Sequence, residues 1–157
     1  MPAPRQPIRT AARAVVIHEG RLLAVKMRDQ EGVYYILPGG GQEHGETLHE
    51  TVRRECLEEV GVEVTVMQLL YVREYIGANH TFNRRHKHFH QLEHVFRCHV
   101  ADPHATRPGT TIDNHQIDVA WLDLAHLDEI RFYPEAVKRF FQGGEVAVSP
   151  LYLGDCN

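Results

Sequence analysis

The sequence lacks the features that mark disulfide-rich, membrane or nucleic-acid-binding proteins. Its cysteines, Cys56, Cys98 and Cys156, are odd in number and widely spaced, so they form neither a disulfide framework nor a zinc motif. No run approaches the roughly 18 apolar residues of a membrane span. The formal net charge of −4 leaves no overall basic field for nucleic acid. We therefore expect a cytoplasmic protein with neither a nucleic-acid nor a membrane partner.

Repeats, low-complexity tracts and long linkers are also absent, so nothing in the composition divides the 157 residues. Hydrophobic residues make up 43 % and charged residues 24 %, which is ordinary for a globular domain with a substantial core. We expect a single domain over residues 1–157. Residues 1–12 contain arginine and proline but no acid, and we expect a flexible lead-in there rather than a transit peptide.

Short apolar runs separated by turn signals predict most of the strands. The strands expected over residues 13–18 and 21–27 would be joined by a tight turn at Glu19-Gly20. A helix is expected over residues 134–142, with Pro134 in its first turn and Gly143 beyond its end. Several strands with two main helices predict an α/β fold in which a mixed sheet lies between helices. Strands are expected over residues 13–18, 21–27, 34–37, 62–76, 90–100 and 117–122.

The most informative stretch begins at Pro38, which three glycines follow. This glycine run is expected to be a turn rather than a regular element. A helix is predicted from Leu48 to Val60, because Thr47 and Glu50 have the spacing of a capping box. Gly61 suits the cap at the other end.

One side of this predicted helix is apolar, and an acidic ridge runs beside it. Glu55, Glu58 and Glu59 fall within about 100° of arc, and like charges at such spacings cost a few tenths of a kcal/mol each. A purely structural helix could avoid that cost, whereas clustered carboxylates suit a hard divalent cation. The alternative is a solvated acidic face. The apolar stripe consists of Leu48, Val52, Cys56 and Val60.

The spacing of these residues is specific. It reads G-x5-E-x7-R-E-C-x-E-E-x-G-V and resembles the signature of the Nudix hydrolases, G-x5-E-x7-R-E-U-x-E-E-x-G-U, in which U is aliphatic. Cys56 departs from that preference, but buried cysteine packs as a small hydrophobe and no catalytic group is lost. The resemblance implies the Nudix fold, an α/β/α sandwich with a mixed β-sheet. The matching positions are Gly40, Glu46, Arg54, Glu55, Glu58, Glu59, Gly61 and Val62.

The resemblance also implies roles for individual residues. Glu55, Glu58 and Glu59 would hold Mg²⁺ or Mn²⁺, with the carbonyl of Gly39 as a further ligand. The ions would neutralise the charge of a diphosphate and acidify a water molecule that attacks one phosphorus. Arg54 would orient the carboxylates, paired with a mainly structural Glu46.

The general base stays open between Glu55, Glu59 and a carboxylate on a later loop. Many Nudix enzymes carry a glutamate on the last loop, several residues before the equivalent of Trp121. This chain departs from that pattern, which shifts weight to the carboxylates of the helix, although Asp113 or Asp118 could substitute. The residues found there are Asp113, His115, Gln116 and Asp118.

Residues 77–90 form the one strongly basic segment and contain no acid. Three interpretations remain open: a solvated loop, a substrate contact, or a metal site built from alternate histidines in an extended segment. Arginine suits phosphate through its planar fork. In the Nudix family, loops outside the signature usually determine the substrate. Candidate substrate-binding residues are therefore Arg84, Arg85 and His88, and the alternate histidines are His86, His88 and His90.

Glu93 is a further candidate substrate-binding residue. It lies on the predicted strand 90–100, on the face opposite the set from Leu92 to Val100 that would meet the core. A lone glutamate there is either a solvated strand residue or a contact to substrate or an auxiliary metal. Aromatic residues that could stack on a nucleobase, or simply pack in the core, are Tyr34, Tyr35, Phe82, Phe89 and Trp121.

These observations predict a Mg²⁺- or Mn²⁺-dependent Nudix hydrolase acting on a small-molecule nucleotide. Its expected substrate is a nucleoside diphosphate linked to another group, with ADP-ribose or a nucleotide sugar preferred. The alternatives are nucleoside triphosphate pyrophosphohydrolysis and a non-catalytic nucleotide-sensing module. A prenyl diphosphate isomerase would need a catalytic cysteine, and Cys98 is expected on the core face. The resemblance also allows a homodimer.

Overall fold

Two mixed β-sheets form the body of the computed structural model, which describes residues 1, 5–80, 86–110, 115–143, 146 and 148–157. The first sheet has the order β10-β6-β7-β1-β5, with bounds Tyr152–Asp155, Thr65–Ile76, His90–His99, Arg9–Val15 and Gly39–Gly41. The second has the order β2-β3-β4-β9, with β8 paired to β3. Its bounds are Ile17–His18, Arg21–Asp29, Gly32–Ile36, Phe132–Tyr133 and, for β8, Gln116–Asp123.

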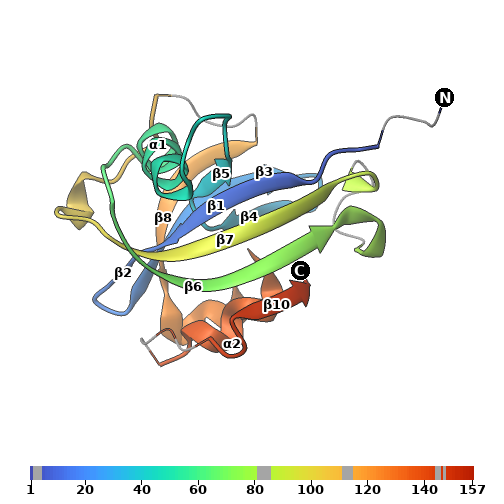
Figure 1. Ribbon diagram of the computed structural model, residues 1–157. Helices are drawn as coiled ribbons and strands as arrows, with labels where there is room; N and C mark the ends of the chain where they lie inside the picture. The colour runs from blue at the N-terminus through green and yellow to red at the C-terminus, as the bar shows by residue number, and fades with distance from the viewer. Residues whose placement is uncertain (2–4, 81–85, 111–114, 144–145, 147) are drawn as a thin grey trace.

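Helices cover the two sides of these sheets. Helix α1 (Leu48–Val60) lies on one side, and the short α2 (Lys138–Phe141) lies on the other (Figure 1). Short 3₁₀ helices span Gly77–Asn79, Pro103–Ala105, Leu124–Glu129 and Glu135–Val137. The expected α/β fold with mixed strands between helices is confirmed, although the strands divide between two sheets. No helix within the described residues is both long and apolar enough to cross a membrane.

Helix α1 has the bounds that its sequence predicts. The Thr47 hydroxyl accepts a hydrogen bond from the Glu50 amide at 3.2 Å, and the Glu50 carboxylate accepts one from the Thr47 amide at 2.7 Å. Gly61 ends the helix in the left-handed region, at φ 71°. The apolar stripe is buried in a core cluster with β1 and β7, and this packing fixes the rotation of the helix. The acidic edge is thereby directed along the glycine strand β5.

Two expectations near the N-terminus are wrong. Strand β1 begins at Arg9, so residues 9–12 are not a flexible lead-in; they pair in parallel with residues 91–94 of β7. The start of this strand is not predicted because its small and polar side chains show no clear alternation of apolar and polar residues. The glycine run is not a free turn either, because β5 pairs antiparallel with β1, with Gly39 opposite Arg13. A Cβ at Gly39 would lie 2.2 Å from the Ala12 carbonyl oxygen, so only glycine permits this pairing.

The C-terminal third also differs from expectation. The helix expected over residues 134–142 is a 3₁₀ turn followed by the single-turn α2. Strands β9 and β10 are not expected from the sequence, because each is shorter than five residues and β10 contains Gly154. Strand β10 pairs in parallel with the edge of β6, as Figure 1 shows beside the C-terminus.

Candidate active site

The acidic ridge of α1 lies against the glycine strand β5. The side chains of Glu55 and Glu58 are 15 % and 32 % exposed. The Gly39 amide donates to Glu59 Oε2 at 3.2 Å. A Cβ at Gly40 would lie 2.6 Å from Glu55 Cδ, so a glycine is needed for the backbone to approach this carboxylate. The fold therefore brings the glycines at 39 and 40 next to the carboxylates of Glu59 and Glu55.

Arg54 orders the carboxylates around it. Its Nε and Nη2 donate to the two oxygens of Glu46 at 2.5 and 3.1 Å, a bidentate pair, and Nη2 also donates to the Gly41 carbonyl at 3.0 Å. Nη1 reaches Glu55 Oε1 at 3.0 Å and Glu58 Oε2 at 3.4 Å. The hydrogen bond from Arg54 lowers the pKa of Glu46 to about 2. The expected pairing of Arg54 with Glu46 is thus present.

Glu59 has the most perturbed environment of the ridge. Burial raises its pKa to about 8, although Arg13 and the Gly39 amide act in the opposite direction. Carboxylate oxygens beside a backbone carbonyl are the donors that a hard divalent cation prefers, so the residues present fit such an ion chemically. Within the described part of the chain, no three His, Cys, Asp or Glu side chains already converge on one point. The ligand set of Gly39, Glu55, Glu58 and Glu59 stays a prediction.

We expect added Mg²⁺ to raise the Tm more at about pH 8.5 than at about pH 6. The pKa of Glu59 in the fold, about 8, exceeds its ordinary value of 4.5, so without metal Glu59 contributes stability that is lost as pH rises between these values. A cation must displace that proton and therefore binds more tightly at higher pH. Thermal unfolding with and without Mg²⁺ measures both shifts. The proposed role of Glu59 would be contradicted if Mg²⁺ raised the Tm equally at both pH values. It would also be contradicted if Glu59→Gln kept the same difference between the two pH values.

A cavity of about 350 Å³ lies next to the ridge, between the two sheets. Arg13 joins the two: it lines the cavity, and its Nη1 donates to the carbonyls of Leu37 at 2.9 Å and Gly39 at 3.4 Å. Arg13 therefore separates a ligand in the cavity from the predicted metal site and can contact both. Other residues lining the cavity include Arg9, Tyr34, Arg73, Phe89, Gln91, Glu93, His115 and Asn157.

Glu93 lies within the wall of this cavity and is fully buried, so the interpretation as a solvated strand residue is wrong. The reason is a second hydrophobic cluster, which covers the face of β7 opposite the first. Glu93 Oε1 pairs with Arg13 Nε at 3.0 Å, and Oε2 accepts from Arg73 Nη2 at 3.1 Å and from Gln91 Nε2 at 2.9 Å. Burial alone would raise the pKa of Glu93, but Arg73 and Arg13 lower it to about 2.

The aromatic candidates separate by position. Tyr34 and Phe89 line the cavity and can meet a planar ring there. Tyr35 packs against the second hydrophobic cluster, and Trp121 Nε1 donates to Thr106 Oγ1 at 2.9 Å beside the first, so both are structural. Phe82 falls outside the described residues.

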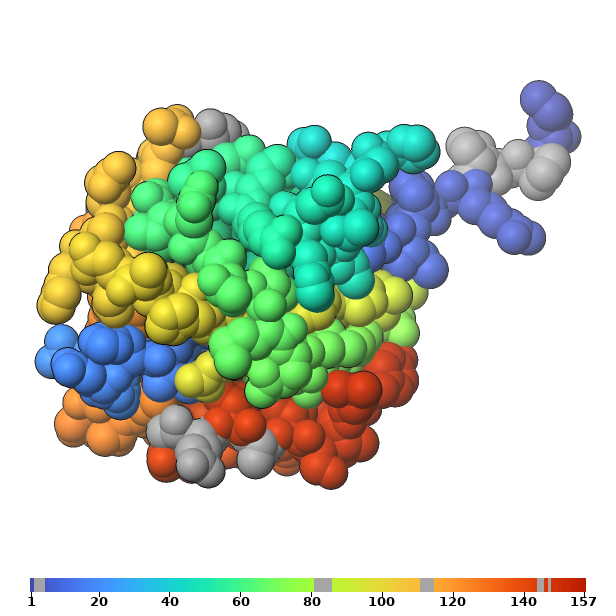
Figure 2. Space-filling model, turned by 60° about the vertical axis from the view of Figure 1, so that its left-hand side comes forward, coloured from blue at the N-terminus to red at the C-terminus, as the bar shows by residue number. Residues whose placement is uncertain are grey.

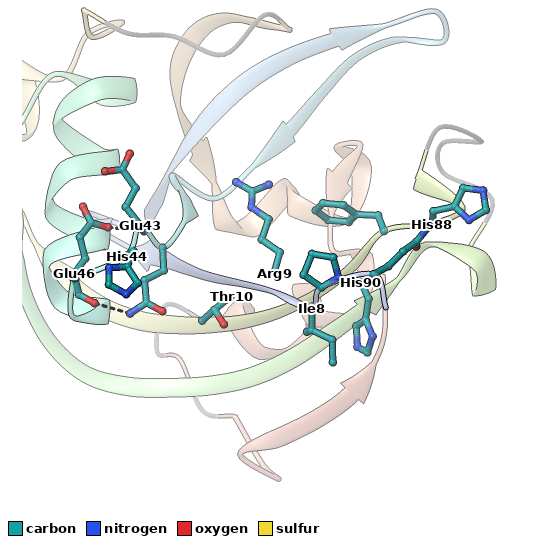
Figure 3. Close-up of a pocket in the computed structure, with 13 residues that line it drawn as sticks. Ile8, Arg9, Thr10, Glu43, His44, Glu46, His88 and His90 are labelled. Atoms are coloured by element: carbon teal, nitrogen blue, oxygen red, sulfur yellow. Dashed lines mark hydrogen bonds between the residues drawn. The ribbon is translucent and has the colours of Figure 1, made fainter. Parts of the chain in front are cut away.

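The basic segment is only partly described, and Arg84 and Arg85 fall outside the described residues. His88 lines a wider basin of about 850 Å³, together with residues 6–10 and 42–46 (Figure 3). Arg9 and Phe89 line both the basin and the cavity, with Arg9 Cζ 5.8 Å from the Phe89 ring centre. Residues 86–88 lie in a turn, closed by the Phe89 amide donating to the His86 carbonyl at 2.8 Å, so they do not have the extended conformation required for a three-histidine metal site.

The last loop contributes in a way that its sequence does not suggest. Gln116 is buried, and its Nε2 donates to the backbone carbonyl of Glu59 at 2.8 Å, which supports the end of α1. His115 lines the cavity. Asp118 is exposed on β8 and accepts from the Val119 amide at 2.8 Å. Asp113 falls outside the described residues, so the general base stays open.

Sequence reasoning missed Arg13 and Arg73, the two cations that neutralise Glu93. A signal for Arg13 is present in the sequence. An arginine set between Ala12 and Ala14, within a run of small and β-branched residues, is expected to be buried and therefore paired.

Comparisons with known proteins agree with this fold. The model of the NUDIX domain family matches residues 7–142. The chain is 27 % identical over 141 residues to nucleoside triphosphatase NudI of Enterobacter sp. (strain 638). The alignment covers 87 % of this chain and 96 % of that protein.

Solved structures show the same architecture. A NUDIX hydrolase from Nitrosomonas europaea superimposes with a TM-score of 0.67 at 19 % identity, over 85 % of each chain. An ADP-ribose pyrophosphatase from Streptococcus suis superimposes with a TM-score of 0.55 at 18 % identity, over 81 % of each chain.

The chain belongs to the NUDIX domain family, as its signature indicates. It is a Nudix hydrolase, an enzyme that acts on phosphoric anhydride bonds, and this family generally uses divalent metal ions.

Proposed function

We propose that this hydrolase cleaves the diphosphate linkage of a small nucleotide and requires Mg²⁺ or Mn²⁺. The observation that carries the proposal is the junction at Gly39, where the acidic ridge, the glycine strand and the arginine-lined cavity meet. A nucleoside in the cavity would extend its phosphates past Arg13 toward Glu59. Single-domain organisation, cytoplasmic location and homodimer formation stay predictions from the sequence.

Each group at the junction has a distinct part in this proposal. Glu55, Glu58, Glu59 and the Gly39 carbonyl hold the cation, which supplies positive charge against the diphosphate when it is bound. Arg54 orients Glu55 and Glu58 and, through Glu46, ties the ridge to the preceding loop. A carboxylate of α1 accepts the proton of the attacking water. Arg13 positions the phosphates, and Glu93 fixes Arg13.

Nucleoside triphosphates are the first substrates to test. The relative NudI, which matches over nearly its full length, is described as a nucleoside triphosphatase. A cavity of about 350 Å³ with aromatic and polar walls suits one nucleoside.

ADP-ribose or a nucleotide sugar is the second candidate. The basin of about 850 Å³ shares Arg9 and Phe89 with the cavity and offers room for a second moiety beyond the diphosphate. Its polar wall includes His88, which can donate a hydrogen bond to a sugar hydroxyl.

A product-resolved assay separates the two candidates. We expect Mg²⁺-dependent release of nucleoside monophosphate and pyrophosphate from a triphosphate. If the second candidate is right, ADP-ribose yields AMP and ribose 5-phosphate instead. A panel of nucleoside triphosphates, nucleotide sugars and dinucleotides should be tested with Mg²⁺, with Mn²⁺ and with chelator. Failure to cleave any of them in the presence of either metal would contradict the proposed function.

A further inference from the structure

The family match ends at residue 142, but the chain continues into a strand that reaches the cavity. Strand β10 lies parallel to the edge of β6, and the two are packed together at the molecular surface (Figure 2). The Val72 amide donates to the Leu151 carbonyl at 2.8 Å, and the Cys156 amide donates to the Glu74 carbonyl at 3.1 Å. These bonds lead the chain to Asn157, which lines the cavity.

Asp155 fastens this segment to the turn that follows β6. Its Oδ1 accepts from the Ile76 amide at 2.9 Å and lies 2.7 Å from His80 Nε2, while Oδ2 accepts from Asn79 Nδ2 at 2.8 Å. The turn in its own right supports the cavity wall, since the Gly77 amide donates to the Phe89 carbonyl at 2.8 Å. One carboxylate of β10 thus fixes the backbone that carries Phe89.

Arg73 connects the same segment to the buried charges beneath the cavity. One side of its guanidinium donates to the Cys156 carbonyl, and the other donates to Glu93 at 3.1 Å. The position of Asn157 is therefore set from two directions, by Asp155 at the surface and by Arg73 from below. Anchoring the two residues before Asn157 restricts its backbone in advance of binding, which lowers the entropic cost of binding.

We propose that Asn157, the residue of segment 155–157 that lines the substrate cavity, forms a specificity wall there. Asn157 recognises the nucleoside through its amide, which presents both a donor and an acceptor and can therefore distinguish the edges of different bases. Asp155 is a positioning residue that acts through the backbone of the segment and of the turn after β6. This inference rests on the proposed function, because it assumes that the cavity holds a nucleoside.

Asn157→Ala tests the wall directly. We expect KM for the preferred nucleotide to rise about tenfold, with kcat within about twofold of wild type, because the substitution leaves the acidic ridge untouched. The order of kcat/KM among ATP, GTP, CTP and UTP should also flatten. Tyr152→Phe is the matched control. It lies on β10, five residues before Asn157, and does not line the cavity; it loses only the hydrogen bond from its hydroxyl to Glu74, so KM and the order should not change.

Asp155→Ala separates positioning from mere stability. We expect the same rise in KM and the same loss of base preference, accompanied by a lower Tm. A lower Tm with unchanged KM and unchanged base order would show that Asp155 is only structural and would overturn its assigned role.

Calorimetric binding of nucleoside monophosphates to the same variants provides a readout independent of turnover. If wild type binds them but cleaves no diphosphate, the proposed function fails while the wall is still tested by the affinities. If wild type is active and Asn157→Ala matches it in KM, base order and affinity, only the wall is overturned. If wild type binds no nucleoside monophosphate, the wall is overturned as well.

Discussion

Replacing Glu59 with glutamine should lower turnover at least ~100-fold while the protein stays folded. Glu59 lies where the ridge, the Gly39 amide and Arg13 meet, and the substitution keeps its shape but removes a charge that a cation or a proton would use. Since burial already raises the pKa of this group, the neutral amide should not destabilise the fold. Steady-state kinetics at saturating Mg²⁺, together with thermal unfolding, measure both effects.

Glu63→Gln is the control for this experiment. It removes the same charge from an exposed position just beyond the end of α1 and should leave turnover unchanged. Full activity in Glu59→Gln would remove Glu59 from the site. Comparable losses in both variants would show that general acidity rather than position is responsible.

Glu93→Ala should destabilise the protein by about 3–5 kcal/mol, the cost of removing one partner from a buried ion pair. The substitution removes the fully buried carboxylate that Arg13 and Arg73 share. Denaturant unfolding measures the free energy, and any remaining folded enzyme should show a raised KM because Arg13 loses its support.

An exposed ion pair supplies the comparison for Glu93. Glu31 pairs with Arg131 at 3.1 Å, but its side chain is 79 % exposed, so Glu31→Ala should change stability by no more than about 1 kcal/mol. A loss below about 1 kcal/mol for Glu93→Ala would mean that the buried charges do not hold the cavity wall together.

The local part of the structure is the part that could be predicted. The limits of α1 follow from a capping box, an apolar stripe and a terminal glycine, all of which act within a few residues. The pairing of Arg54 with Glu46 follows from the family signature, and both groups lie where that signature implies.

The remainder depends on contacts that no local pattern reveals. The glycines of β5 form a strand only because β1 lies alongside, and β1 begins early because β7 pairs with residues 9–12. Glu93 is buried because a second hydrophobic cluster covers its face and two arginines from other strands neutralise it. Asn157 reaches the cavity through a short strand without its own hydrophobic periodicity.

The most direct measurement is anomalous scattering from crystals soaked in Mn²⁺ with a non-hydrolysable nucleotide analogue. The predicted result is metal density contacting Glu55, Glu59 and the Gly39 carbonyl, with the phosphates of the analogue between this metal and Arg13. Nucleotide bound elsewhere, with no metal along the acidic edge of α1, would contradict the proposal that these carboxylates hold a cation against a diphosphate.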